Sequence, residues 1–200
     1  MRRKAFTLVE ILVVVAIAGI IIIAALAPLT FTIRTISRAQ KNFSVSNRER
    51  FVINRIFADA AEVLGIQCEV PFRLIRHDEL GSAADDTLLL WTKTPSYTGE
   101  AMACVAYRML PDSILGQEMP DGLYRWVLSA DAQPGDIKED DLRREDGKLV
   151  LGGLIGARFS VLKDGEWVDE YSGGTPQALR VTLQKEEGEV AYESQLSAKF

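Results

Sequence analysis

Hydrophobic residues fill the first part of the chain almost without interruption. Residues 11–27 contain no charged or strongly polar side chain. With residues 6–10 added, the apolar run approaches the roughly 20 residues that span the hydrocarbon core of a bilayer. Three bases at positions 2–4 precede it, and it contains one carboxylate, Glu10. We therefore predict a helix that is covered by lipid or by neighbouring helices.

A helical spacing of apolar and amide side chains continues beyond this run. These side chains recur at steps of three and four residues, the period of one helix face: Leu29, Ile33, Ile36, Gln40, Phe43 and Asn47, and then Ile53, Ile56, Phe57, Ala60 and Leu64. We predict one helix from about Phe6 to Leu64, with Gly65 as its C-terminal stop. At 1.5 Å per residue this helix is ~88 Å long, so a small domain can bury only its second half.

Short extended runs bounded by turn residues follow Gly65. Asp-Gly pairs at 121–122, 146–147 and 164–165 predict tight turns, the last of them a hairpin. Eight strands are predicted, at 72–75, 87–91, 104–109, 123–128, 148–151, 157–162, 179–184 and 190–196. We expect an α+β fold in which the second half of the helix packs on one antiparallel β-sheet.

Charge is distributed unevenly along a chain of 200 residues that is 48% hydrophobic and has a net charge of −5. Residues 34–55 hold six bases and one acid, whereas residues 56–200 hold 14 bases and 26 acids. The acidic part repels nucleic acid, so we expect no nucleic-acid partner. The basic stretch is either a solvated helix face or a contact for anionic lipid or an acidic partner helix.

The apolar run has three possible fates. A cleaved secretory signal would have a shorter apolar core, and its cut after Ala27 would leave Pro28 at the new terminus. A permanent signal anchor explains the length of the run, but it gives Glu10 no role, although a charge in the membrane costs roughly 2.5 to 3.5 kcal/mol. The third fate keeps the helix and gives the acid a partner.

That third fate is suggested by a family resemblance. The stretch RRKAFTLVEILVVVAIAGII, residues 2–21, resembles the class III signal of type IV pilins and of the pseudopilins of type II secretion systems. The resemblance implies a leader peptide at 1–5, cut by prepilin peptidase between Ala5 and Phe6, and N-methylation of Phe6. It implies that Glu10 meets a terminal amine of a neighbouring subunit and sets the helix register. This chain has Ala5 where the family has Gly before the cut.

Three later stretches narrow the resemblance. They are CVAYRMLPDSILGQEMPDGLYRWV, GARFSVLKDGEWVDEY and TPQALRVTLQ, and they look like the pseudopilin J family. The implied protein is a minor pseudopilin at the tip of the type II secretion pseudopilus, with major and other minor pseudopilins as partners. Its implied parts are a transmembrane and assembly helix at 6–28, in contact with inner-membrane lipid, and a periplasmic pilin-like α+β domain at 29–200. The alternative is a minor pilin of a type IV pilus or DNA-uptake filament, and a third candidate is a signal-anchored periplasmic enzyme or binding protein.

Residues that could carry chemistry are few, and we predict no enzyme activity, no cofactor and no metal. His77 is the only histidine, no nucleophile motif lies near it, and we expect it to be exposed and structural. The acidic segment 135–147 could bind calcium, as some relatives in the superfamily do, but it lacks EF-hand spacing. We expect a solvated loop there. The aromatic residues of 123–126 could anchor a partner, but strand alternation favours a core role for some of them.

Cys68 and Cys104 are the only cysteines. In an oxidising periplasm they can form one disulfide, which would stabilise the domain by closing a long loop. The other possibility is two separately buried thiols, and both possibilities stay open at this point.

Overall fold

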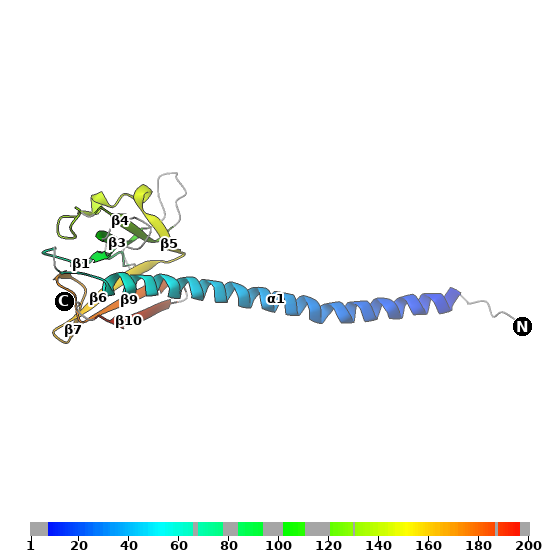
Figure 1. Ribbon diagram of the computed structural model, residues 1–200. Coiled ribbons are helices and arrows are strands. Elements are labelled where there is room, and N and C mark those ends of the chain that lie inside the picture. The colour runs from blue at the N-terminus through cyan, green and yellow to red at the C-terminus, as the bar shows by residue number, and fades with distance from the viewer. Residues whose placement is uncertain are drawn as a thin grey trace, which may run out of the picture. The chain divides into compact units, whose positions relative to one another are not determined.

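The computed structural model describes residues 8–65, 68–77, 84–93, 102–110, 121–129, 131–186 and 188–196. The chain divides into two compact units, Met1–Asn47 and Arg48–Phe200. The helix α1 (Leu8–Ala61) contributes its first part to one unit and its last turns to the other (Figure 1). All strands lie in the second unit.

The first unit consists, in its described residues, of helix alone. Its large aliphatic side chains are exposed wherever the structure describes them: Leu8, Val9, Leu12, Val13, Val15, Ile17, Ile20, Ile21 and Ile36. Within the described part of the chain, no helix meets the length and mean hydropathy of a candidate membrane span.

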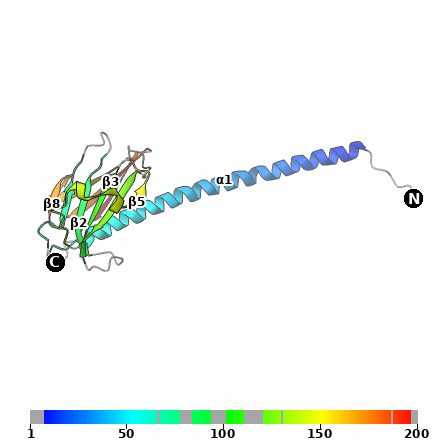
Figure 2. The same ribbon diagram turned by 90° about the horizontal axis from the view of Figure 1, so that it is seen from above.

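Two antiparallel sheets form the second unit (Figures 1 and 2). The larger sheet has the order β5-β4-β3-β2-β1-β8, and the smaller has the order β10-β9-β6-β7. Their bounds are β1 (Phe72–Ile75), β2 (Thr87–Lys93), β3 (Met102–Leu110), β4 (Gly122–Leu128), β5 (Lys148–Gly152), β6 (Gly156–Lys163), β7 (Glu166–Val168), β8 (Tyr171–Gly173), β9 (Ala178–Lys185) and β10 (Gly188–Gln195).

The main core lies where the last turns of α1 meet both sheets. Ile53, Ile56 and Ala60 of α1 share one buried cluster with Leu88 and Val105 of the larger sheet, and the same cluster includes side chains of the smaller sheet: Phe159, Val161, Leu179, Val181 and Leu183. Burial of this continuous apolar surface is the main stabilising contribution to the unit. It also fixes which face of α1 remains available to solvent.

A second core covers the other face of the larger sheet. Leu89, Trp91, Tyr124 and Trp126 pack there against Ile137 and Leu142, which flank the short 3₁₀ helix Glu139–Asp141. A second 3₁₀ turn, Arg144–Asp146, leads into β5.

The prediction of antiparallel β-structure is confirmed, and all eight expected strands are present. The Asp164-Gly165 hairpin is confirmed as well, because both residues adopt positive φ (52° and 89°) between β6 and β7. The expectation that the helix packs on one sheet was wrong, because the strands form two separate sheets. The three-residue strands β7 and β8 were not predicted.

The expected C-terminal end of the helix was also wrong. The helix ends at Ala61, not at Leu64. Beyond it Val63 pairs with Thr92, and the Leu64 amide donates to the Trp91 carbonyl oxygen at 3.2 Å. The chain leaves the helix early because β2 offers these backbone partners. The expected start at Phe6 lies outside the described residues.

Candidate functional site

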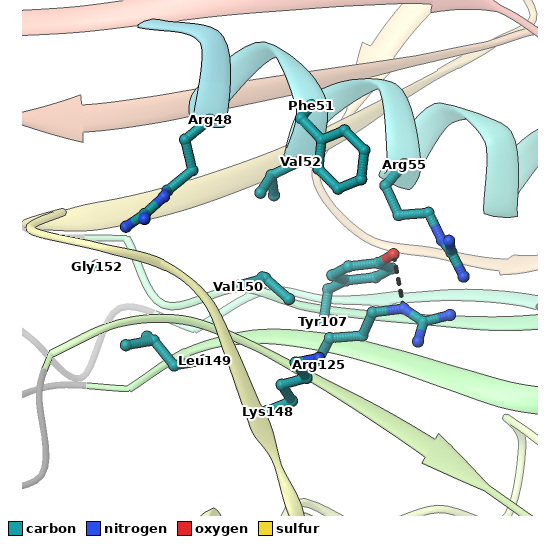
Figure 3. A pocket seen from close by; sticks show the side chains of 10 residues that line it. All are labelled: Arg48, Phe51, Val52, Arg55, Tyr107, Arg125, Lys148, Leu149, Val150 and Gly152. Atoms are coloured by element: carbon teal, nitrogen blue, oxygen red, sulfur yellow. Dashed lines mark hydrogen bonds between the residues drawn. The ribbon is translucent and has the colours of Figure 1, made fainter. Parts of the chain in front are cut away.

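A pocket of about 670 Å³ lies in the second unit, between the last turns of α1 and the larger sheet (Figure 3). Its helical wall consists of Arg48, Phe51, Val52 and Arg55. The spacing i, i+3, i+4, i+7 places these four side chains on one face of the helix. Val52 is buried, whereas Phe51 keeps 72% of its surface exposed, so the wall has an apolar floor and an aromatic edge.

The opposite wall comes from three neighbouring strands. Tyr107 of β3 and Arg125 of β4 are directly opposed residues in the sheet. Lys148, Leu149 and Val150 of β5 complete this wall together with Gly152. Figure 3 shows the helix residues on one side and the strand residues on the other. The pocket is therefore held by a helix and a sheet and not by loops.

A buried carboxylate, Asp59, organises the polar end of the pocket. Its Oδ2 accepts hydrogen bonds from the Tyr107 hydroxyl at 2.7 Å and from Arg125 at 2.8 and 3.1 Å. Its Oδ1 accepts one from Arg55 Nε at 3.1 Å. Arg125 Nε also donates to the Tyr107 oxygen at 3.0 Å. One acid thus fixes two arginines and a tyrosine in the pocket wall.

The surroundings raise the pKa values of Tyr107 and Arg125. Burial, followed by the Asp59 charge, raises the pKa of Tyr107 well above its usual range, so the hydroxyl stays protonated and donates. Burial by itself would lower the pKa of Arg125, but Tyr107 and Asp59 outweigh it and raise that pKa. The side chains of Arg125 and Asp59 are only 8% and 7% exposed, so their charge-assisted bonds are little screened by solvent.

The pocket is strongly cationic. Of the lining residues that the structure describes, four are bases, Arg48, Arg55, Arg125 and Lys148, and none is an acid. Asp59 behind the wall offsets one of these charges. The chain as a whole carries a net charge of −5, so the pocket has the opposite sign to the average surface.

A second buried acid holds α1 on the smaller sheet. Glu49 accepts a hydrogen bond from Tyr192 of β10 at 2.7 Å and forms an ion pair with Lys185 of β9. Burial, followed by the hydrogen bond to Glu49, raises the pKa of Tyr192 to about 12. With Asp59 bonded to the larger sheet, α1 is anchored by polar contacts on two sides.

The residues predicted for processing and assembly lie in the first unit. Ala5 and Phe6 fall outside the described residues. Glu10 lies in the first turn of α1, and its side chain is not among those described. The predicted cleavage, methylation and register contacts therefore remain predictions.

The two cysteines are both buried, and both are free thiols in the structure. They belong to the second core cluster. Burial, followed by the neighbouring Cys68, raises the pKa of the Cys104 thiol to about 12. Free, buried thiols are one of the two possibilities left open by the sequence, and a Cys68–Cys104 disulfide in an oxidising compartment is the other.

His77 was expected to be exposed, and this was wrong. Its side chain is 15% exposed, because the segment around Glu139 folds over it and presents its carboxylate to Nε2. Glu139 also pairs with Arg108 at 2.9 Å, and Asp141 accepts the Lys138 amide at 2.8 Å. The segment 135–147 is thus not simply a solvated loop. Among the described residues no group of acids, cysteines and histidine could hold a metal ion.

Sequence reasoning did not identify the pocket. Leu123, Tyr124, Arg125 and Trp126 are all buried, so a core role is confirmed for this stretch. One signal was available, because Arg55 and Asp59 have the i, i+4 spacing of a helical ion pair. The pairing of Tyr107 with Arg125 requires the sheet register, which the sequence does not specify.

Comparison with known proteins gives one match, at the N-terminus. Residues 1–26 match the family model described as the prokaryotic N-terminal methylation motif. No curated protein matches the chain, and no solved structure does. The matched residues include the expected cleavage position and Glu10, so the chain begins with a type IV pilin-like prepilin signal.

Proposed function

We propose that this chain is a structural subunit of a pilin-like filament and, more narrowly, a minor pseudopilin at the tip of a type II secretion pseudopilus. Prepilin peptidase cuts it between Ala5 and Phe6, and the new amine of Phe6 is methylated. The observation that carries the proposal is the match of residues 1–26 to the N-terminal methylation motif. Proteins with this signal are structural rather than catalytic, in keeping with the predicted lack of enzyme activity.

Two features of the structure support a pilin-like subunit. The matched residues 1–26 include the first turns of α1, whose described aliphatic side chains are exposed in the first unit. Such a surface needs lipid or neighbouring helices as cover. The last turns of α1 then pack into antiparallel sheets, so a single helix links an uncovered apolar stretch to a folded domain.

Glu10 supplies the contact that this proposal requires between subunits. In a low-dielectric helix bundle, a carboxylate is strongly attracted to a nearby ammonium group, which offsets part of its desolvation. The new N-terminal amine of Phe6 in a neighbouring subunit is the proposed partner. The subunit is first anchored in the inner membrane with its domain in the periplasm, and it then enters the filament.

The assignment to pseudopilin J depends on the three C-terminal stretches. They correspond here to β3 and β4, to β6 and β7, and to β9. Similar strand motifs occur in minor pilins, so a type IV pilus subunit is the alternative. Genes for a secretin and other pseudopilins beside this one favour secretion, whereas pilus retraction components favour the alternative.

Mass spectrometry of the full chain, co-expressed with a prepilin peptidase, tests the proposal. The expected product begins at Phe6 and carries one N-terminal methyl group. The Ala5→Leu variant should keep Met1, because a bulky residue is not accepted before the cut, whereas Ala5→Gly should be cut at least as fast as the wild type. A wild-type chain that stays uncut, or one cut after Ala27, would refute the proposal.

A further inference from the structure

We infer that the cationic pocket beside α1 is a docking site for an acidic segment of another assembly subunit. The segment would insert an apolar side chain between Phe51 and Val150 and place carboxylates beside Arg48 and Lys148. This inference rests on the proposed function for the partner being a filament subunit. The chemistry of the segment follows from the pocket itself.

The charge of the pocket determines the sign of its partner. Arg48 and Lys148 are exposed at its rim, and neither makes an ion pair with any residue that the structure describes. Arg55 and Arg125 lie deeper, and both bond to Asp59. The charges of Arg48 and Lys148 therefore attract a complementary acidic surface and disfavour a basic one.

The apolar part of the pocket provides the anchor. Phe51 is a large aromatic residue that is 72% exposed, and Val52 and Val150 line the pocket with it. Aromatic residues and arginines surrounding an apolar centre are the composition typical of binding hot spots. An acidic segment without an apolar side chain would leave this centre in water.

The pocket is preorganised for such a segment. Asp59 fixes the guanidinium groups of Arg55 and Arg125 and the hydroxyl of Tyr107 through hydrogen bonds of 2.7 to 3.1 Å. Glu49 holds α1 from the smaller sheet. Binding therefore immobilises few side chains beyond Arg48, Phe51 and Lys148, which reduces its entropic cost.

A short protein segment fits better than a long polyanion. Outside the pocket the folded part of the chain is acidic, with 26 acids and 14 bases over residues 56–200. An extended nucleic acid would meet this repulsion along its length. A short segment with a few carboxylates around one apolar side chain would contact only the pocket and would avoid the acidic surface outside it.

Fluorescence anisotropy on the full chain in a non-ionic detergent tests this inference. The probe is a labelled peptide with two central leucines between aspartate and glutamate residues. We expect saturable binding that weakens about threefold for Arg48→Glu or Lys148→Glu and about tenfold for the pair. Phe51→Ser should also weaken it at least threefold, because the anchor loses its apolar contact.

The matched control is Arg143→Glu. Arg143 is an exposed base outside the pocket, with its side chain 72% exposed, so its reversal changes net charge equally and should leave binding unchanged. Circular dichroism checks that each variant is folded. Two control peptides complete the test: one with serines in place of the leucines, and one with lysines in place of the acids, and both should bind more weakly.

Several results would overturn the inference. One is the absence of saturable binding up to about 1 mM. Another is that Arg143→Glu weakens binding as much as the pocket variants do. A third is that the serine peptide binds as tightly as the leucine peptide. A single-stranded oligonucleotide that binds as tightly would indicate a general polyanion site. Self-association of the wild type that Arg48→Glu abolishes would make a second copy the occupant. N-terminal processing is independent of all these results, so failure here leaves the proposed filament role to its own test.

Discussion

Asp59 is the residue on which the wall of the pocket depends most. Its two oxygens accept bonds from Arg55, Tyr107 and Arg125. Removing one partner of a buried charge cluster is costly, because the remaining charge stays desolvated. The stability of this region and the orientation of its arginines therefore rest on the same carboxylate.

Replacing Asp59 with asparagine should destabilise the folded domain by about 3 to 5 kcal/mol, because the buried Arg125 guanidinium loses its counter-charge. Urea unfolding followed by tryptophan fluorescence of the full chain measures this. Glu145→Gln is the matched control, since Glu145 is an exposed acid, and it should change stability by less than about 0.5 kcal/mol. Equal losses for the two variants would contradict the role given to Asp59.

The buried carboxyl group of Asp86 should make the stability of the folded domain depend on pH. Its buried carboxylate accepts the backbone N–H groups of His77 at 3.3 Å and Phe159 at 3.0 Å. Burial raises its pKa from 3.8 to about 6, although the two hydrogen bonds and Arg158 act in the opposite direction. Protonation therefore favours the folded state. The resulting stability is fully present below pH 3.8 and is lost as the pH rises through about 6.

The variant Asp86→Asn removes this titration, but its amide keeps only one of the two acceptor oxygens that His77 and Phe159 use. It should therefore be less stable than the wild type at pH 4, and this difference should shrink by roughly 1 to 3 kcal/mol by pH 8, because only the wild type loses stability as its carboxyl ionises. Urea unfolding at several pH values between these limits measures the difference. A wild-type curve that rises from pH 4 to pH 8 relative to the variant would contradict the expected sign.

For single residues, the sequence predicts interactions between side chains that are close together in the chain, but not between side chains that are far apart in it. The i, i+4 spacing of Arg55 and Asp59 can be read directly. Tyr107 faces Arg125 because of the β3–β4 register, and a shift of one residue would turn Arg125 to the opposite face of the sheet. That register is set by tertiary packing, which the alternation pattern does not specify.

Among the elements, the strands could be predicted because alternation and turn residues are local properties. β1 was found with the predicted bounds, Phe72–Ile75. β7 and β8 have three residues each, too few to show a period. The division into two sheets could not be predicted, because alternation shows that a strand has a buried face but not which strand it pairs with.

The turn before β5 provides a prediction at the scale of elements. A Cβ on Gly147 would lie 2.6 Å from the Trp126 ring, and the Trp126 indole N–H donates to the Arg143 carbonyl oxygen at 2.7 Å. Gly147 has an ordinary φ of −88°, so the expected penalty is steric. Gly147→Ala should destabilise the domain by about 1 to 3 kcal/mol through displacement of the indole.

Gly174→Ala is the control for that substitution, because nothing lies within 4 Å of the added Cβ. It should stay within about 0.5 kcal/mol of the wild type. Thermal unfolding by circular dichroism compares the two variants. If Gly147→Ala were as stable as Gly174→Ala, the tight packing of β4 against this turn would be refuted.

For the whole molecule, the prediction concerns the helix that enters both units. Under the proposed function, Glu10→Ala should still be processed at Ala5, since the proposed peptidase site is intact, but should lose most of its assembly with partner subunits. Co-purification of partner pseudopilins with the full chain measures assembly, and mass spectrometry measures processing. Glu145→Ala removes an equal charge from the folded domain and should assemble normally. Unchanged assembly of Glu10→Ala would refute the register role.

The buried thiols also determine how this protein can be studied. Maleimides react with thiolates, and a thiol whose pKa is about 12, like that of Cys104, has almost none at neutral pH. Cys68 is likewise buried, and burial raises its pKa. A third cysteine introduced on the surface, for example at Lys163 beside the hairpin turn, would therefore take up a dye or spin label selectively. The native cysteines can stay in place, so the core need not be altered when distances between labelled subunits of the proposed filament are measured.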